Sequence, residues 1–235
     1  MPSVRRCWLV AVMGALALLY VTSPAQAGFV LQLTSTGGGD SGVTTGANGR
    51  VMFSGALPGD PNFLTNVTTG LSKGSLGVPG STATNAIMDL NSVNAAATGA
   101  GVLTIKLSDT DFTDNNQGNT LTVAIGGTLP AGASLTAQTF EAKSNLNFDT
   151  SGFAGPLQSF SAPPAAFSGT ASVTRGPLGT FSMTEVVTIT FTQAGSVSFD
   201  YRANSVPEPS SLTLASLGLL GLVGYCLRRR KALGA

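Results

Sequence analysis

The segment Leu103-Thr104-Ile105-Lys106-Leu107-Ser108 alternates apolar and polar residues without interruption. Successive side chains of a β-strand point to opposite faces of its sheet, so this segment predicts a strand with one buried and one solvent-exposed face. The same alternation recurs at 121–125, 187–191 and 197–201. Short alternating segments separated by Gly, Pro, Asn and Asp are typical of antiparallel strands joined by turns.

Weaker segments of the same kind extend the pattern along the chain. Further strands are predicted at 29–34, 50–54, 86–90, 134–140, 146–148 and 166–173. Two Gly- and Ser-rich stretches, 35–49 and 68–85, are expected to be loops. With about eight to ten strands and no amphipathic helix, the body of the chain is predicted to be all-β, an antiparallel β-sandwich of which the jelly roll is one form.

The charge and the residue composition of the body exclude several functions. Between 28 and 205 there are six basic and ten acidic residues, so nucleic acid, which needs a basic patch, is not an expected partner. The chain has no histidine, and its two cysteines, Cys7 and Cys226, both lie in the terminal segments. The body therefore has no thiol, no internal disulfide and no Ser-His-Asp triad, and we expect neither a metal nor a cofactor.

The N-terminus has the three parts of a secretory signal peptide. Arg5 and Arg6 precede an uncharged segment at 8–21, which Ala25-Gln26-Ala27 follows as a small-residue cleavage site. Signal peptidase is expected to cut between Ala27 and Gly28. An N-terminal membrane anchor and a twin-arginine signal are the alternatives, but the segment is short and two arginines alone are weak evidence for the latter.

The C-terminus is also tripartite. Val206-Pro207-Glu208-Pro209-Ser210-Ser211 is followed by an apolar stretch at 212–227 and the basic cluster Arg228-Arg229-Arg230-Lys231. This order resembles the PEP-CTERM sorting signal of Gram-negative bacteria and their relatives. The resemblance covers only about the last thirty residues, and it implies recognition at Val206 to Pro209 by the membrane protease exosortase, in species that make extracellular polysaccharide.

The physical properties of this tail agree with the resemblance. Pro207 and Pro209 disfavour helix in the residues before them, so 206–209 is expected to be extended. The 16 apolar residues at 212–227 are just short of a spanning helix, which they can form if the flanking residues contribute. The basic cluster at 228–231 is then the cytoplasmic membrane stop.

Three segments follow from these observations. We expect a signal peptide at 1–27, an exported β-sandwich domain at 28–205 and the sorting signal at 206–235, with its motif at 206–211. The protein is expected to be anchored in the inner membrane by its C-terminal helix before processing. After processing it is expected at the cell surface or in the extracellular matrix.

Two kinds of binding site are considered within the body. Asp109, Asp111 and Asp114 form an oxygen-rich cluster that is a weak calcium candidate, since the spacing departs from the EF-hand loop and a solvated turn explains it better. An ice-binding face would require the threonines at 188–192 to be matched on neighbouring strands.

A hydrolytic site is the third kind considered. The carboxylates that could serve a glycosidase are Glu141, Glu185, Asp149 and Asp200, but only in residue type. Glu185 and Asp200 lie within strand patterns, where isolated surface acids are common. We therefore expect no enzyme activity.

Two functional hypotheses remain. The preferred one is a non-catalytic exported surface or matrix protein, sorted and cleaved by exosortase and associated with exopolysaccharide or biofilm. The alternative is a module that binds or hydrolyses extracellular polysaccharide. A cleft lined by two close carboxylates or by aromatic side chains would favour the alternative.

Overall fold

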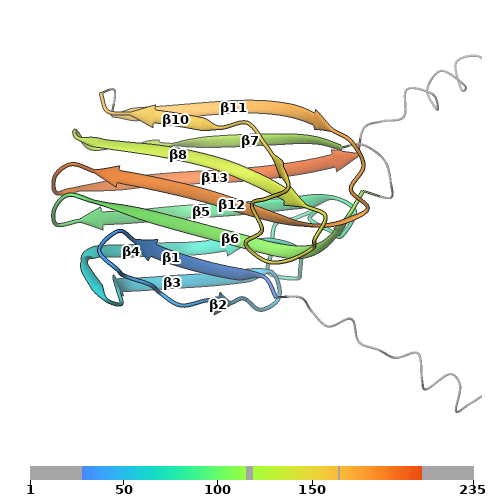
Figure 1. The fold of residues 1–235 in the computed structure, drawn as a ribbon, viewed down its shortest axis with the longest axis horizontal. Coiled ribbons are helices and arrows are strands. Elements are labelled where there is room, and N and C mark those ends of the chain that lie inside the picture. Colours follow the sequence, from blue (N-terminus) through green and yellow to red (C-terminus); the bar gives the residue numbers. More distant parts are fainter. Residues whose placement is uncertain (1–27, 115–118, 164, 208–235) are drawn as a thin grey trace, which may run out of the picture.

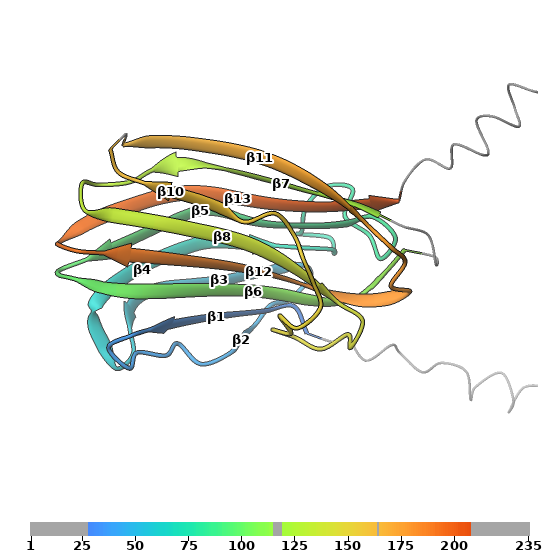
Figure 2. The same ribbon diagram turned by 45° about the horizontal axis from the view of Figure 1, so that its top comes forward.

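The computed structural model describes residues 28–114, 119–163 and 165–207, and these form a sandwich of two antiparallel sheets (Figures 1 and 2). No helix occurs among these residues. The prediction of an all-β antiparallel sandwich is confirmed.

Each sheet combines strands from both halves of the chain. Sheet A has the order β10 (Gln158–Ser161), β8 (Ala133–Ala142), β12 (Thr180–Phe191), β6 (Gly101–Thr113), β1 (Val30–Ser35), β2 (Thr44–Thr45), with β9 (Phe153–Ala154) also on β8. Sheet B has the order β11 (Ala166–Arg175), β7 (Asn119–Thr128), β13 (Gly195–Pro207), β5 (Ala86–Ala97), β4 (Asp60–Leu71), β3 (Arg50–Leu57).

The pairing of the strands is nested. Strand β5 pairs with β13, β6 with β12, β7 with β11, and β8 with β10, each pair antiparallel. This is one long double strand folded over on itself so that its successive pairs alternate between the two sheets. The same nesting underlies jelly-roll sandwiches.

The core forms where the apolar sides of the alternating segments meet. Leu103, Ile105 and Leu107 of β6 are fully buried, and they belong to one core cluster with residues of sheet B such as Val197 and Phe199. The polar residues between them, including Thr104 and Lys106, lie on the outer side and are partly exposed. Period-two patterning therefore predicts both the strands and the side that each strand buries.

Several strand predictions were wrong. Strands β2, β4, β9 and β10 were not predicted; β2 lies within the expected loop 35–49, and β4 extends into the expected loop 68–85. The inward positions of β4 include Thr65 and Gly70, where an apolar residue would have marked a strand. The core packs closely against Gly70, since a Cβ atom there would lie 2.5 Å from Leu107 Cδ1. The segment 146–148, predicted as a strand, is a turn in which Phe148 has a φ of 61°.

The start of β1 and the end of β13 lie at the same end of the sandwich (Figure 1). We call this the tail end; the β4–β5 loop, the β8–β9 loop and the β11–β12 turn also lie there. The opposite, far end carries the β3–β4, β5–β6, β7–β8 and β12–β13 hairpins. Strand β13 continues to Pro207, two residues beyond the predicted end of the domain at 205.

Candidate functional site

A shallow groove of about 660 Å³ crosses the outer face of sheet B. Four neighbouring strands, β11, β7, β13 and β5, supply its side chains. The lining residues are Asp89, Asn91, Ala124, Ile125, Gly126, Ser168, Gly169, Thr170, Asp200 and Arg202.

The register of the strands explains why the face is hollow here. Arg202 of β13 lies between Asp89 of β5 and Ala124 of β7, and Asp200 lies beside Gly126. Long polar side chains on β13 and β5 therefore stand next to the smallest side chains on β7. A Cβ atom on Gly126 would meet nothing closer than 3.7 Å, so the space above it is open.

The groove contains two carboxylates and one guanidinium. Burial raises the pKa of Asp89 to about 6, an effect that Arg202 opposes and Asp200 reinforces. Asp200 Oδ1 accepts a hydrogen bond of 2.5 Å from the Ser92 amide, which lies at a bulge of β5. The site can therefore donate and accept hydrogen bonds and can change its charge near pH 6.

Sequence reasoning identified only Asp200 of these charged residues. Asp89 and Arg202 are far apart in the sequence and meet only because β5 pairs with β13. The alternation at 197–201 does place Asp200 on the solvent side, and extending it by one residue places Arg202 there too. No local signal relates Asp89 to either of them.

The other carboxylates considered for hydrolysis lie elsewhere. Glu141 and Glu185 are fully buried, and Asp149 lies in the β8–β9 loop, where Ser144 and Ser151 donate hydrogen bonds to it. Glu185 was expected to be an ordinary surface acid, but it occupies an inward position of β12. The four residues predicted from type alone do not face one another across a cleft.

Glu185 has an unusual environment. Neither of its carboxyl oxygens has a well-formed hydrogen bond within the described residues. Burial raises its pKa well above the usual value, the charge of Asp89 adds to this effect, and the nearby Ala203 amide offsets part of it. Its neighbour Tyr201 is also buried and shares a 2.8 Å hydrogen bond with Thr139.

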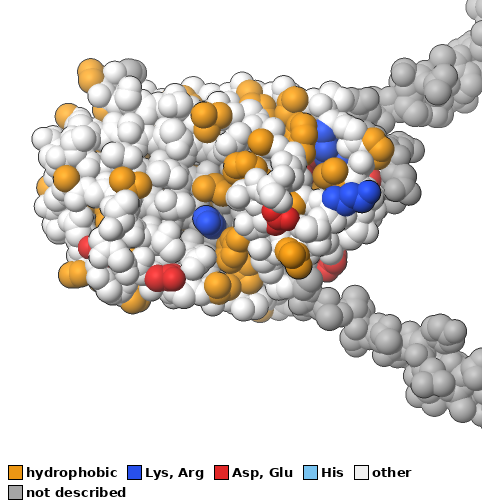
Figure 3. Space-filling view, in the orientation of Figure 1, with side chains coloured by type: hydrophobic (Ala, Val, Ile, Leu, Met, Phe, Trp, Pro, Cys, Tyr) orange, Lys and Arg blue, Asp and Glu red, His pale blue; other side chains and the backbone are white. Residues whose placement is uncertain are grey.

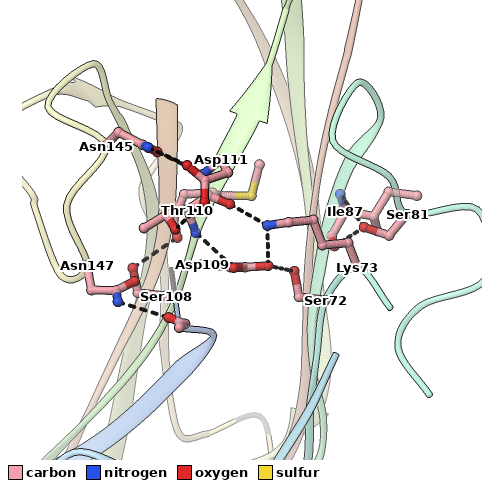
Figure 4. Close-up of polar contacts among 12 residues, drawn as sticks. Ser72, Lys73, Ser81, Ile87, Ser108, Asp109, Thr110, Asp111, Asn145 and Asn147 are labelled. Carbon is pink, nitrogen blue, oxygen red and sulfur yellow. Dashed lines mark hydrogen bonds and ion pairs between the residues drawn. The ribbon is translucent and has the colours of Figure 1, made fainter. Parts of the chain in front are cut away.

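The three carboxylates of the weak calcium candidate turn to different partners, and Figure 4 shows two of them, Asp109 and Asp111. Asp109 accepts hydrogen bonds from Ser72 and Lys73, and Asp111 accepts one from Asn145. Asp114 binds Arg175 instead. No cluster of three metal-ligating side chains occurs in the part of the chain that the structure describes.

Arg175 joins two of the buried acids into an ion cluster at the tail end. Its Nη1 donates to Asp114 Oδ2 at 2.6 Å, and its Nε donates to Glu141 Oε2 at 2.5 Å. Burial alone would raise the pKa of Asp114, but hydrogen bonds from the Leu178 amide, Arg175 and the Gly179 amide lower it. This arrangement closes the end of the core, and all three side chains of the cluster are buried.

Of the threonines considered for ice binding, Thr188 belongs to a row of threonines that crosses sheet A. Thr188 lies in register with Thr104 and Thr136, and Thr104 is in turn in register with Thr34. The adjoining row contains Val102, so matching rows do not repeat across the face. Thr192 lies beyond the end of β12, where its hydroxyl donates to Gly132 O.

The tail motif begins inside the fold. Val206 and Pro207 are the last residues of β13 and are in register with Thr120 and Asn119 of β7. Gly28 is the first described residue. The remaining predicted processing residues lie outside the described residues: Ala25, Ala27, Glu208, Pro209, Arg228, Arg229, Arg230 and Lys231. Among the described residues no helix is long and apolar enough to cross a membrane.

Comparison with known families identifies the tail. Residues 205–231 match the PEP-CTERM protein-sorting motif, so the chain carries this motif at its C-terminal end. The match confirms the resemblance seen in the sequence. Its first residues, 205–207, are also the last residues of β13, so the motif and the sandwich overlap. A comparison with curated proteins gave no match.

Solved structures with similar folds are distant. A carbohydrate-binding module in complex with beta-1,4-galactotriose has a TM-score of 0.32 and 8% identity, covering 47% of this chain and 68% of that one. The K1 cleaved adhesin domain of Lys-gingipain from Porphyromonas gingivalis has a TM-score of 0.32 and 12% identity, covering 68% and 99%. A carbohydrate-binding module of the β-sandwich superfamily has a TM-score of 0.30 and 11% identity, covering 76% and 84%. Similarities this low say nothing about function.

Proposed function

We propose that this chain is an exported surface protein that exosortase sorts and cleaves through its PEP-CTERM tail. The observation that carries the proposal is the motif at 205–231, which follows the sandwich without a separating linker. In this proposal signal peptidase releases the chain at Gly28, and the apolar stretch at 212–227 holds it in the inner membrane. Cleavage near Val206 to Pro209 then transfers the sandwich to the cell surface or matrix.

Fractionation of the native host tests this route. In cells with exosortase, the protein is expected in the surface and matrix fractions. In cells without exosortase, it is expected to stay in the inner-membrane fraction. An unchanged distribution between the two strains would contradict the proposed sorting.

We further propose that the sandwich is non-catalytic and acts as a component of the extracellular matrix. Three acids, Glu141, Asp114 and Glu185, are buried inside the fold. Glu141 and Asp114 form ion pairs with Arg175. Such a module contributes a stable body with a polar, hydroxyl-rich exterior to the exopolysaccharide layer or biofilm.

The groove on sheet B favours a more specific version, in which the sandwich binds extracellular polysaccharide. Asp89, Asn91, Asp200 and Arg202 supply donors and acceptors of the kind that sugar hydroxyls need, and Gly126 leaves room for a sugar unit. The groove has no aromatic platform among its described lining residues. Binding would therefore depend on hydrogen bonds and would be weak for each sugar unit.

Blocking the groove tests this version. In Gly126→Gln the new Cβ atom meets nothing closer than 3.7 Å, and the rest of the side chain occupies space in the groove. The matched control is Gly99→Gln in the β5–β6 hairpin at the far end, where a Cβ atom would also meet nothing closer than 3.6 Å. Retention on immobilised host exopolysaccharide should fall for Gly126→Gln only; equal retention of both variants would contradict the assignment.

A further inference from the structure

We infer that the tail end of the sandwich is a membrane-docking surface, which rests on the lipid headgroups while the uncleaved tail is inserted. The surface consists of Leu76 in the β4–β5 loop, Leu146 and Lys143 in the β8–β9 loop, and Arg50 at the start of β3. This inference rests on the proposed insertion of 212–227.

The connection between β13 and the apolar stretch at 212–227 is short. Strand β13 ends at Pro207, and the apolar stretch begins at Leu212. The short segment between them reaches at most about 17 Å when fully extended. A headgroup layer takes up about 5 to 7 Å of that distance. The tail end of the sandwich is therefore held within about 10 Å of the headgroups, and the loops that surround β13 there meet them first.

The side chains at this end suit a lipid interface. Leu76 and Leu146 are 58% and 63% exposed, among the highest values for large apolar side chains in the described residues. Arg50 and Lys143 are exposed basic residues at the same end. Apolar side chains that enter the headgroup boundary, together with cations that attract anionic lipids, are the two contributions that bind proteins to membrane surfaces.

The loops that carry the two leucines are anchored to the sandwich. Lys73 forms a 2.8 Å ion pair with Asp109, and Asn145 donates a 2.7 Å hydrogen bond to Asp111 (Figure 4). The Leu76 amide also donates to Asn48 O at 2.9 Å. Leu76 and Leu146 are therefore held outward by structured loops on either side of the end of β6.

The tail end carries charged residues of both signs. Four of the six basic residues of the body, Arg50, Lys73, Lys143 and Arg175, lie there, together with five acids, Asp109, Asp111, Asp114, Glu141 and Asp149. Lys73 and Arg175 pair with Asp109, Asp114 and Glu141. Among the described residues, the exposed charged side chains of this end are therefore Arg50 and Lys143, with Asp111 and Asp149 half-buried. Asp149 accepts hydrogen bonds from Ser144 and Ser151. In Figure 3 basic, acidic and hydrophobic side chains are all visible toward the end where β13 stops.

Tryptophan reporters test the inference, because residues 28–235 contain no tryptophan. The uncleaved precursor, made without exosortase, is reconstituted into vesicles of phosphatidylethanolamine and phosphatidylglycerol as Leu76→Trp or Leu146→Trp. The matched control is Leu64→Trp on the outer face of sheet B, where the native leucine is 59% exposed. Fluorescence is measured with ordinary and with brominated lipids, and urea unfolding verifies that each variant is folded.

In the Leu76→Trp and Leu146→Trp variants, emission should shift to shorter wavelength and be largely quenched by brominated lipid, while emission from the control stays water-like. Water-like emission from all three variants in protein that floats with the vesicles would overturn the docking surface but not the anchoring. Failure to float would overturn the anchoring itself, and the inference with it. A shift without bromine quenching would mean that these side chains leave water without reaching the lipid, and would overturn lipid docking.

Discussion

Pro207, the last residue of β13, lies in register with Asn119, the first residue of β7. Two residues earlier, Ser205 is buried and its hydroxyl accepts a 3.1 Å hydrogen bond from Asn119 Nδ2. The sorting motif therefore starts within a central strand of sheet B. Cleavage after Pro207 leaves β13 complete, whereas cleavage several residues before Pro207 would remove part of sheet B.

Truncation at two points should separate these outcomes. A chain that ends at Pro207 keeps every pair of β13 with β7, so its free energy of unfolding should equal that of the mature protein. A chain that ends at Ala203 loses the register pairs of 204–207 and the buried Ser205, and should be about 2 to 4 kcal/mol less stable. Urea unfolding measures both; equal stability would show that the end of β13 does not contribute to the fold.

Replacing Arg175 with methionine should strongly destabilise the protein. The change leaves Asp114 and Glu141 buried without their cation, a situation that costs about 3 to 5 kcal/mol. Arg50→Met, which removes an exposed arginine at the same end, serves as the control and should change stability by less than about 0.5 kcal/mol. A similar urea midpoint for the two variants would argue against a role for the cluster in closing the core.

Glu185→Gln should stabilise the protein, and more so at higher pH. The usual pKa of glutamate is 4.5, and burial raises that of Glu185 well above it. Above pH 4.5 the unfolded chain ionises while the folded one holds its proton, so the wild type loses stability as pH rises until the folded pKa is reached. Glutamine has no such loss.

The stability difference between Glu185→Gln and wild type should therefore grow as the pH rises above 4.5. Asp149 gives the opposite control, because hydrogen bonds from Ser144 and Ser151 lower its pKa. Asp149→Asn should lower stability at neutral pH and have less effect at low pH. A difference for Glu185→Gln that does not change with pH would mean that the carboxyl is ionised in the folded protein.

Alanine substitutions at the adjacent residues Gly126 and Gly127 should change stability by different amounts. A Cβ atom on Gly127 would lie 2.2 Å from Ser198 O and 2.8 Å from Phe199 Cα, both in the backbone of β13. Gly127→Ala should therefore cost about 1 to 3 kcal/mol or more, as overpacking does. Gly126→Ala points into the open groove and should be nearly neutral. Thermal unfolding of the pair measures the contrast, and equal midpoints would contradict the close approach of β7 to β13.

Local patterning accounts for what could be predicted from the sequence. Leu103, Ile105 and Leu107 mark a buried face by themselves, so β6 and strands like it were predicted correctly. Strand β4 was not predicted because its inward face includes Thr65 and Gly70. The polarity of Glu185 suggested the wrong face, although its spacing from Val187 places it inward.

The groove could not be predicted because it depends on pairing between distant segments. Asp89 and Arg202 become neighbours only through the nested pairing of β5 with β13, which no short stretch of sequence specifies. The contacts of Asp109, Asp111 and Asp114 could not be predicted for the same reason, since these carboxylates find their partners in different loops. The tail motif could be read directly, because its three parts are contiguous.

The mass of the C-terminal peptide of the mature protein, from the native host grown with and without exosortase, tests the central proposal most directly. We expect a chain that ends between Val206 and Pro209 when exosortase is present, and an intact end through Arg228 to Ala235 when it is absent. An intact C-terminus in both cultures would contradict sorting by exosortase and make the protein a permanently anchored one.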